Sequence, residues 1–239
     1  MNRVAATSAV LVVLINVVIA QQAATHAPDG TTVERLQSIS VPPKSNAPFS
    51  ATVNTEWTRI FEDGSSRTLK NRRLIARDSV GRVFQQRTFL AADGNPAQSQ
   101  ITSIEISDPQ QHTIASCDPQ GQVCRLNFYR GVGVEIAASP APNIKAENLG
   151  TIAMNGLEVV GSRETQTLNQ LFTGTDRPLV ITKEFWYSAQ LGLNISTKRN
   201  DPRSGSEVFT VTDITPGDPD PSLFVLPKTA RLVDLRPTR

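Results

Sequence analysis

Apolar and polar residues alternate along the chain from Phe49 onward. In FSATVNTEWTRIF the large apolar side chains Phe49, Val53, Trp57 and Phe61 fall on one side, with Ser, Thr, Asn and Glu on the other. A period of two is typical of a strand with one buried face. Turn-forming residues interrupt this alternation at 62–64, 78–81, 93–95, 108–109 and 118–121. The pattern predicts a meander of antiparallel strands, in which each strand pairs with its neighbour in sequence.

A second group of strands follows GVGVEIAASPAPNIKAE (131–147), a segment without periodicity that we expect to form a long loop. Alternation returns in TIAMNGLEVVGSRET, LVITKEFWYS, LNISTKR and SEVFTVTDI. The stretch FWYSAQLGLNISTKR (185–199) predicts a hairpin whose turn lies at 188–192. In the tail, Leu223, Phe224 and Leu226 are expected to close one end of the core. We therefore predict a mainly β fold with few short helices, in which roughly nine or ten antiparallel strands form one domain over residues 48–235.

The first residues do not share this alternation. One basic residue, Arg3, precedes an uncharged apolar run over 4–20, and Val18 and Ala20 stand where a small-residue cleavage site requires them. This layout is typical of a secretory signal peptide, with an uncleaved membrane anchor as the alternative. Residues 21–47 are polar and contain proline, so we expect a flexible lead-in in which Thr32 caps at most one short helix.

Charge and cysteine usage agree with export of a compact β protein. The formal charge is +2, and removal of residues 1–20 takes away one arginine and no acid, which leaves +1. A chain this close to neutral gives no support for nucleic-acid binding. Cys117 and Cys124 flank a turn with Pro119 and Gly121, so they are expected to form a disulfide in an oxidising compartment. The alternative, a metal or redox pair, lacks the C-x-x-C spacing.

Residues suited to catalysis are sparse. The chain has two histidines, His26 and His112, and contains neither a G-x-S-x-G nucleophile motif nor a glycine-rich phosphate loop. Two histidines far apart in sequence do not build a multi-histidine metal site. The sequence therefore predicts no catalytic residue, no metal and no cofactor.

The most prominent charge feature is a basic run that includes Lys70, Arg72, Arg73 and Arg77. One interpretation is a basic surface that contacts anionic lipids or envelope polymers. On a strand, however, Lys70 and Arg72 point one way while Arg73 and Arg77 point the other. The alternative interpretation is that these charges provide solubility and protect an edge strand from aggregation.

Aromatic and apolar side chains supply the candidate ligand-binding residues. Phe49, Val53, Trp57 and Phe61 share one strand face, and Trp186 lies in the second group of strands. They either fill a core or line an apolar cavity, and alternation alone does not separate these cases.

Several segments together resemble a family of exported bacterial proteins of unknown function. They are ENLGTIAMNGLEVVGSRET (147–165), GTDRPLVITKEFWYSAQLGL (174–193), KRNDPRSGSEVFTVTDI (198–214) and PDPSLFVLP (219–227). With the matches PFSATVNTEWTRIFEDGS and RDSVGR, the resemblance covers most of residues 48–227 and brings no catalytic residues.

More distantly, the order W-Y-S, turn, strand, D-P-R-x-G, strand, L-F-x-x-P resembles LolA-like and RseB-like lipoprotein-carrier domains. This resemblance implies a single curved, unclosed antiparallel sheet whose concave apolar face holds a lipid or acyl chain in the periplasm.

Three functional hypotheses remain at this point. The first is a periplasmic or secreted, non-enzymatic protein that binds a hydrophobic envelope ligand. The second is an envelope sensor that recognises a protein partner through a sheet edge or the basic run. The third and weakest is a hydrolase without a recognisable motif.

Overall fold

Twelve strands form one sheet in the computed structural model, which describes residues 39–92, 100–129 and 143–236. The strands are β1 (Phe49–Ile60), β2 (Ser66–Arg77), β3 (Val83–Thr88), β4 (Ile101–Asp108), β5 (Thr113–Cys117), β6 (Val123–Phe128), β7 (Ile144–Met154), β8 (Leu157–Leu168), β9 (Leu179–Ser188), β10 (Leu193–Asp201), β11 (Gly205–Pro216) and β12 (Arg231–Asp234). Two helices of one turn accompany them, α1 (Gln170–Thr173) and the 3₁₀ helix η2 (Pro221–Phe224).

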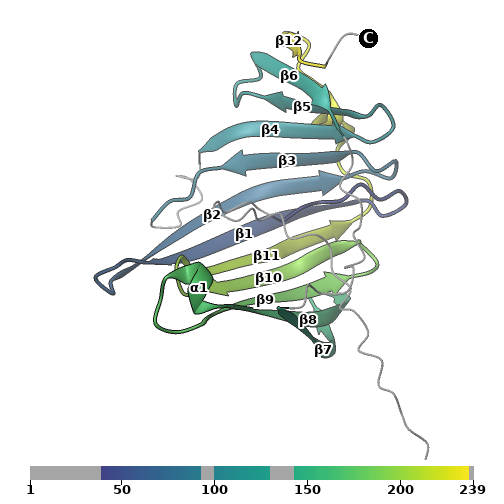
Figure 1. The fold of residues 1–239 in the computed structure, drawn as a ribbon. Coiled ribbons are helices and arrows are strands. Elements are labelled where there is room, and N and C mark those ends of the chain that lie inside the picture. The colour runs from purple at the N-terminus through teal and green to yellow at the C-terminus, as the bar shows by residue number, and fades with distance from the viewer. Residues whose placement is uncertain (1–38, 93–99, 130–142, 237–239) are drawn as a thin grey trace, which may run out of the picture.

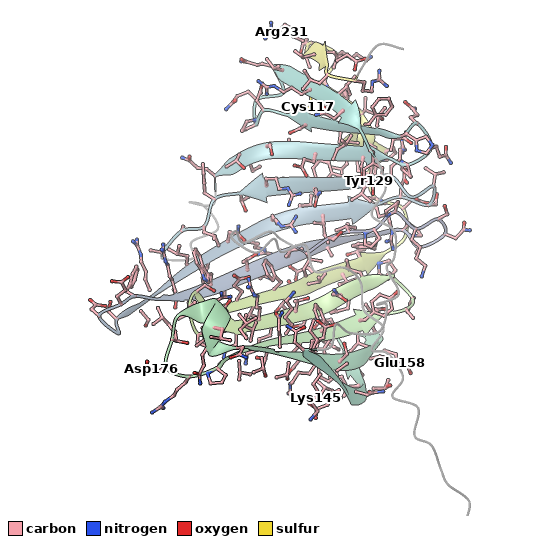
Figure 2. All side chains as sticks on the ribbon, viewed as in Figure 1. Cys117, Tyr129, Lys145, Glu158, Asp176 and Arg231 are labelled. Atoms are coloured by element: carbon pink, nitrogen blue, oxygen red, sulfur yellow. A yellow bond between two sulfur atoms is a disulfide. The ribbon has the colours of Figure 1, made fainter. Side chains whose placement is uncertain are left out.

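The sheet is built from two meanders, β1–β6 and β7–β11, that join through antiparallel pairing of β1 with β11 (Figure 1). The strand order is β12-β6-β5-β4-β3-β2-β1-β11-β10-β9-β8-β7. Strands β12 and β7 are the two edges: Arg231 and Cys117 mark one end of the sheet in Figure 2, and Lys145 and Glu158 the other. The predicted curved, unclosed antiparallel sheet is confirmed.

Two details of that prediction are wrong. The sheet has twelve strands rather than nine or ten, and β12 pairs with β6 in parallel. The loop predicted over residues 131–147 ends earlier than expected, because β7 begins at Ile144. The rest of that loop, up to residue 142, lies outside the described residues.

Two predicted hairpins are confirmed, and each has a local cause. Gly192 closes the β9–β10 turn with a φ of 62°, and its N–H donates to the Ser188 carbonyl at 2.7 Å. A left-handed φ is cheap for glycine, which explains its place there. In the β5–β6 hairpin, Cys117 lies opposite Cys124 and the two form a disulfide. Asp118 stabilises that turn by accepting backbone N–H groups, including that of Val123 at 2.6 Å.

Both sides of the sheet carry apolar clusters, and adjacent residues of β2 belong to different ones. Ile75 lies in the main core with Phe49, Val53 and Val211, all 0% exposed. The next residue contributes to a smaller cluster on the other side, formed by Ala76, Phe84, Ile106 and Phe224, with Leu223 and Leu226 packed against it. The prediction that the tail closes part of the core is therefore confirmed.

Residues 39–47, here called the strap, run over the main core without helix or strand. Ile39, Val41 and Ala47 are 4%, 6% and 7% exposed. The Asn46 N–H donates to the Ser79 carbonyl at 2.9 Å, which ties the strap to the β2–β3 turn. The prediction of a flexible lead-in over residues 21–47 is thus wrong for residues 39–47, because apolar side chains anchor this segment to the core. The expected signal peptide and the short helix after Thr32 fall on residues outside the described ranges, apart from the helix's last residue, Ile39.

Within the described ranges, no helix has the length and apolar character needed to cross a bilayer.

Candidate functional site

Pairing of the central strands defines two faces. The interior face is the side of β1 on which Phe49, Val53 and Trp57 lie and over which the strap runs. The outer face is the side of Asn54 and Glu56. Because residues directly opposite each other on paired strands share a face, the strand register assigns each neighbour to one face or the other.

The interior face changes from apolar to charged over three successive rows. In the apolar row, Val53 lies between Val211 on β11 and the buried Arg73 on β2, whose charge is the exception in this row. The mixed row lies two residues further along each strand from the apolar row. It crosses six strands and consists of Asn71, Thr55, Phe209, Thr197, Phe185 and Ser162. Two positions further, the charged row runs Leu69, Trp57, Glu207, Arg199, Lys183 and Glu164. Buried apolar side chains therefore dominate this face at the strap end, where Arg73 and Arg77 are also buried, and ionic groups dominate the other end.

Buried ion pairs hold the charged row in place. Arg199 Nη2 lies 3.2 Å from Asp201 Oδ2, and its Nη1 lies 3.8 Å from Glu207 Oε1. Arg203 donates to both oxygens of the Asp201 carboxylate, at 3.0 and 2.8 Å. Burial by itself would raise the pKa of Asp201, but the hydrogen bonds and charges of Arg203 and Arg199 bring it below its ordinary value.

Two residues of the basic run lie inside the protein. Arg73 is 2% exposed and Arg77 is 0% exposed, so their assignment to a basic surface is wrong. Arg77 donates to the carbonyls of Pro42, Ala47 and Leu191, while Arg73 donates to that of Ile39. Burial lowers the pKa of Arg73 to about 9 and that of Arg77 to about 10. These side chains are buried because backbone carbonyls of the strap and of the β9–β10 turn need donors.

Lys70 and Arg72 lie on the outer face, as strand alternation predicts. Lys70 pairs with Glu56 at 2.8 Å and Arg72 with Asp213 at 2.7 Å, and all four side chains are about half exposed. Protection of an edge strand is not their role, because β2 lies between β1 and β3.

Charges alternate in sign across seven strands of the outer face, with one apolar interruption. This charge ladder consists of Glu147, Arg163, Glu184, Lys198, Val208, Glu56 and Lys70. Arg163 bridges Glu147 and Glu184, at 3.6 and 2.9 Å. Burial by itself would raise the pKa of Glu184, but hydrogen bonds from Arg163 and Trp186 bring it below its ordinary value.

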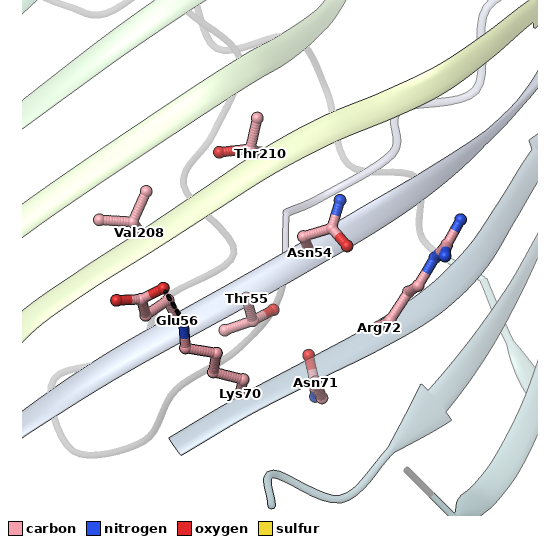
Figure 3. Close-up of a pocket in the computed structure, with 8 residues that line it drawn as sticks. All are labelled: Asn54, Thr55, Glu56, Lys70, Asn71, Arg72, Val208 and Thr210. Atoms are coloured by element: carbon pink, nitrogen blue, oxygen red, sulfur yellow. Dashed lines mark ion pairs between the residues drawn. The ribbon is translucent and has the colours of Figure 1, made fainter. Parts of the chain in front are cut away.

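Two shallow polar hollows of about 340 Å³ each lie along the charge ladder. The first, drawn in Figure 3, is bordered by Glu56, Lys70, Arg72 and neighbouring residues of β1, β2 and β11. The second lies over β8–β11 and includes Arg163, Glu184 and Lys198. Acidic and basic side chains of the outer face pair with each other, so this polar surface carries mostly compensated charges.

The predicted ligand-binding residues do not form one cluster. Phe49 and Val53 are fully buried in the core with the strap. Trp57 and Phe61 lie towards the other end of β1, where the Arg59 guanidinium lies 5.6 Å from the Trp57 ring and 5.5 Å from that of Phe61.

Trp186 lies in none of the three rows, but it packs against the same main core as Phe49 and Val53. It lies opposite Gly161, and a methyl group on Gly161 would come within 2.5 Å of the indole ring. Its indole N–H donates to Glu184 at 3.0 Å.

Sequence reasoning missed the charged row. Alternation along KRNDPRSGSEVFTVT shows that Arg199 and Glu207 each point away from their sequence neighbours. It does not show which strands pair, and the row exists only through pairing of β11 with both β1 and β10. In the described part of the chain, no group of three or more His, Cys, Asp and Glu is placed to hold a metal ion.

No protein-family model and no curated protein sequence matches the chain. Among solved structures, a chain of the Pseudomonas aeruginosa MucA/MucB complex is 12% identical with a TM-score of 0.42. That match covers 78% of this chain and 58% of the other, so the protein spans less than three fifths of its length.

Two further structures are similar. A LolA superfamily protein from Nitrosomonas europaea is 10% identical, with 77% and 92% of the two chains covered and a TM-score of 0.33. The Mycobacterium tuberculosis lipoprotein LppX is 12% identical, with 72% and 87% covered and a TM-score of 0.28. At these identities the similarity concerns the fold alone, and with all three TM-scores below 0.5 it carries no further conclusion.

Proposed function

We propose that the protein is a non-enzymatic binding protein of the bacterial envelope, exported to the periplasm, that holds the acyl part of a lipid on its interior face. The observation that carries this proposal is the change along that face from the apolar row, through the mixed row with Phe209 and Phe185, to the charged row. An amphiphile has the same order of polarity along its length, and the rows follow that order apart from the buried Arg73 opposite Val53.

The physical basis of binding is burial of hydrocarbon. Each Å² of acyl surface removed from water contributes about 25 cal/mol, and a charged end held in place prevents the chain from binding in reverse. Trp57 lies in the charged row and Phe61 directly follows the end of β1, so their rings border the expected entrance. Phe49 and Val53 lie beneath the strap, which would have to shift for a chain to reach them.

A second candidate function, recognition of a protein partner, has support from one edge of the sheet. Strand β7 spans eleven residues, most of them exposed, and β8 is its one partner among the strands of the described residues. An open edge of this length can accept an added strand from another protein.

Mass spectrometry of organic extracts from the purified protein separates these functions. We expect a reproducible lipid in the wild-type extract and much less in Phe209→Ala, whose side chain lies on the interior face. Val208→Ala, one residue away on the outer face, is the matched control. A wild-type protein that is free of lipid and captures an extended peptide along β7 contradicts acyl binding.

A further inference from the structure

Two cations lie side by side in the charged row. Lys183 on β9 is directly opposite Arg199 on β10. Both are partly buried, and the Arg199 side chain is 12% exposed. Like charges directly opposite each other across two strands destabilise a sheet, more so where water is partly excluded. Carboxylates flank the pair, with Glu207 opposite Arg199 and Glu164 opposite Lys183, and a further anion between the two cations would reduce their mutual repulsion.

One buried N–H of Arg199 has no acceptor in the described part of the chain. The two terminal nitrogens approach Asp201 and Glu207, whereas the Nε–H meets no described acceptor. Asp201 in turn is held mainly by Arg203, which contacts both of its oxygens. The guanidinium edge that carries Nε is therefore available for another oxygen ligand, and guanidinium edges bind carboxylate and phosphate oxygens well.

A buried hydroxyl lies next to this pair. Ser162 on β8 is opposite Phe185, one row further into the face and one strand away from Lys183. It is 2% exposed, and its Oγ has no hydrogen-bond partner among residues 39–92, 100–129 and 143–236. A buried hydroxyl without a partner lowers stability and is rare in folded proteins. Its position towards the apolar end suits contact with the inner oxygen of a headgroup.

The geometry points to a specific ligand class for the proposed lipid-binding function, on which this inference rests. Arg199 and Lys183, with the Ser162 hydroxyl, bind the anionic carboxylate or phosphate headgroup of the amphiphile, and the acyl chain extends over the mixed row towards the strap. Glu207 lies beside Arg199 and competes with the headgroup for it. Removal of this carboxylate by Glu207→Gln should therefore strengthen binding of an anionic amphiphile.

Calorimetric titration with laurate and with dodecanol tests the inference, because the two share a twelve-carbon chain and differ in charge. We expect laurate to bind the wild-type protein at least about tenfold more tightly, the effect of one charge-assisted hydrogen bond. Arg199→Gln should bring laurate to the level of dodecanol and leave dodecanol unchanged. Lys198→Gln, the neighbouring residue on the outer face, should change neither.

A second variant covers the case in which Arg199→Gln does not fold. Ser162→Ala removes a hydroxyl without a partner, so a purely structural role predicts equal or higher stability and unchanged binding. Loss of laurate affinity in a stable Ser162→Ala protein supports the headgroup site.

The outcomes distinguish failure of the headgroup site from failure of the proposed acyl binding. Equal binding of laurate and dodecanol, unchanged in both variants, overturns the headgroup site while acyl binding stands. Binding of neither amphiphile overturns both. Inorganic phosphate that binds alone and is lost in Arg199→Gln, with no laurate binding, contradicts the lipid headgroup and assigns the site to a free anion.

Discussion

Strand β2 carries four basic residues within eight positions, and its two sides use them in opposite ways. Arg73 and Arg77 on the interior side are 2% and 0% exposed and donate to strap carbonyls. Lys70 and Arg72 on the outer side are about half exposed and pair with surface carboxylates. Chemically similar residues therefore act as internal ties on one side and as solvated ion pairs on the other.

The largest difference in unfolding free energy is expected between the variants Arg77→Met and Arg72→Met. Loss of Arg77 leaves the buried carbonyls of Pro42, Ala47 and Leu191 without their donor, at a cost of roughly 3 to 5 kcal/mol in unfolding free energy. Loss of Arg72 breaks an exposed pair and should cost less than about 1 kcal/mol. Urea denaturation of both variants measures the difference, and equal costs would show that the strap is not held by Arg77.

A smaller effect is expected at Asp201, where the readout is pH dependence. Its folded pKa lies below the ordinary 3.8, so its contribution is present above that pH and is lost as pH falls through the folded value. Asp201→Asn should cost about 2 kcal/mol at neutral pH, because a buried ion pair loses its charge.

Stability measured against pH decides this point. The gap between wild type and Asp201→Asn should close below pH 3.8. A gap that stays constant down to pH 2 would mean that the carboxylate charge is not what stabilises the charged row.

The smallest effect is expected for the exposed pair Glu56 and Lys70. A double-mutant cycle with glutamine at both positions should give a coupling of about 0.2 to 1 kcal/mol, because both side chains are about half exposed. Added salt should weaken it further. A coupling above 2 kcal/mol that resists salt would show that the outer face is organised like the interior one.

The sequence predicts local elements better than their assembly. Period-two alternation and glycine placement are enough to identify the β9–β10 hairpin, and Cys117 and Cys124 identify the β5–β6 turn. Alternation also separates Arg72 from Arg73. The partnership of β1 with β11 is not visible, because it joins residues more than 140 positions apart through backbone hydrogen bonds that any sequence can make.

For the same reason the sequence does not predict the strap. Ile39 and Val41 are isolated apolar residues in a polar segment of the sequence. Packing against the main core and hydrogen bonds from Arg73 and Arg77 of β2 give that segment its fixed place. The candidate site depends on both long-range features, so the sequence supplied its residue types without their arrangement.

The two tryptophans lie at different places relative to the charged row and test the central claim most directly. Trp57 lies in that row, whereas Trp186 lies opposite Gly161 and packs against the main core. Fluorescence of the single-tryptophan variants Trp186→Phe and Trp57→Phe is measured with a fatty acid brominated near its carboxyl end. Binding with the carboxyl end in the charged row predicts strong quenching of Trp57 and much less quenching of Trp186. Equal quenching of both, or quenching of Trp186 alone, would contradict it.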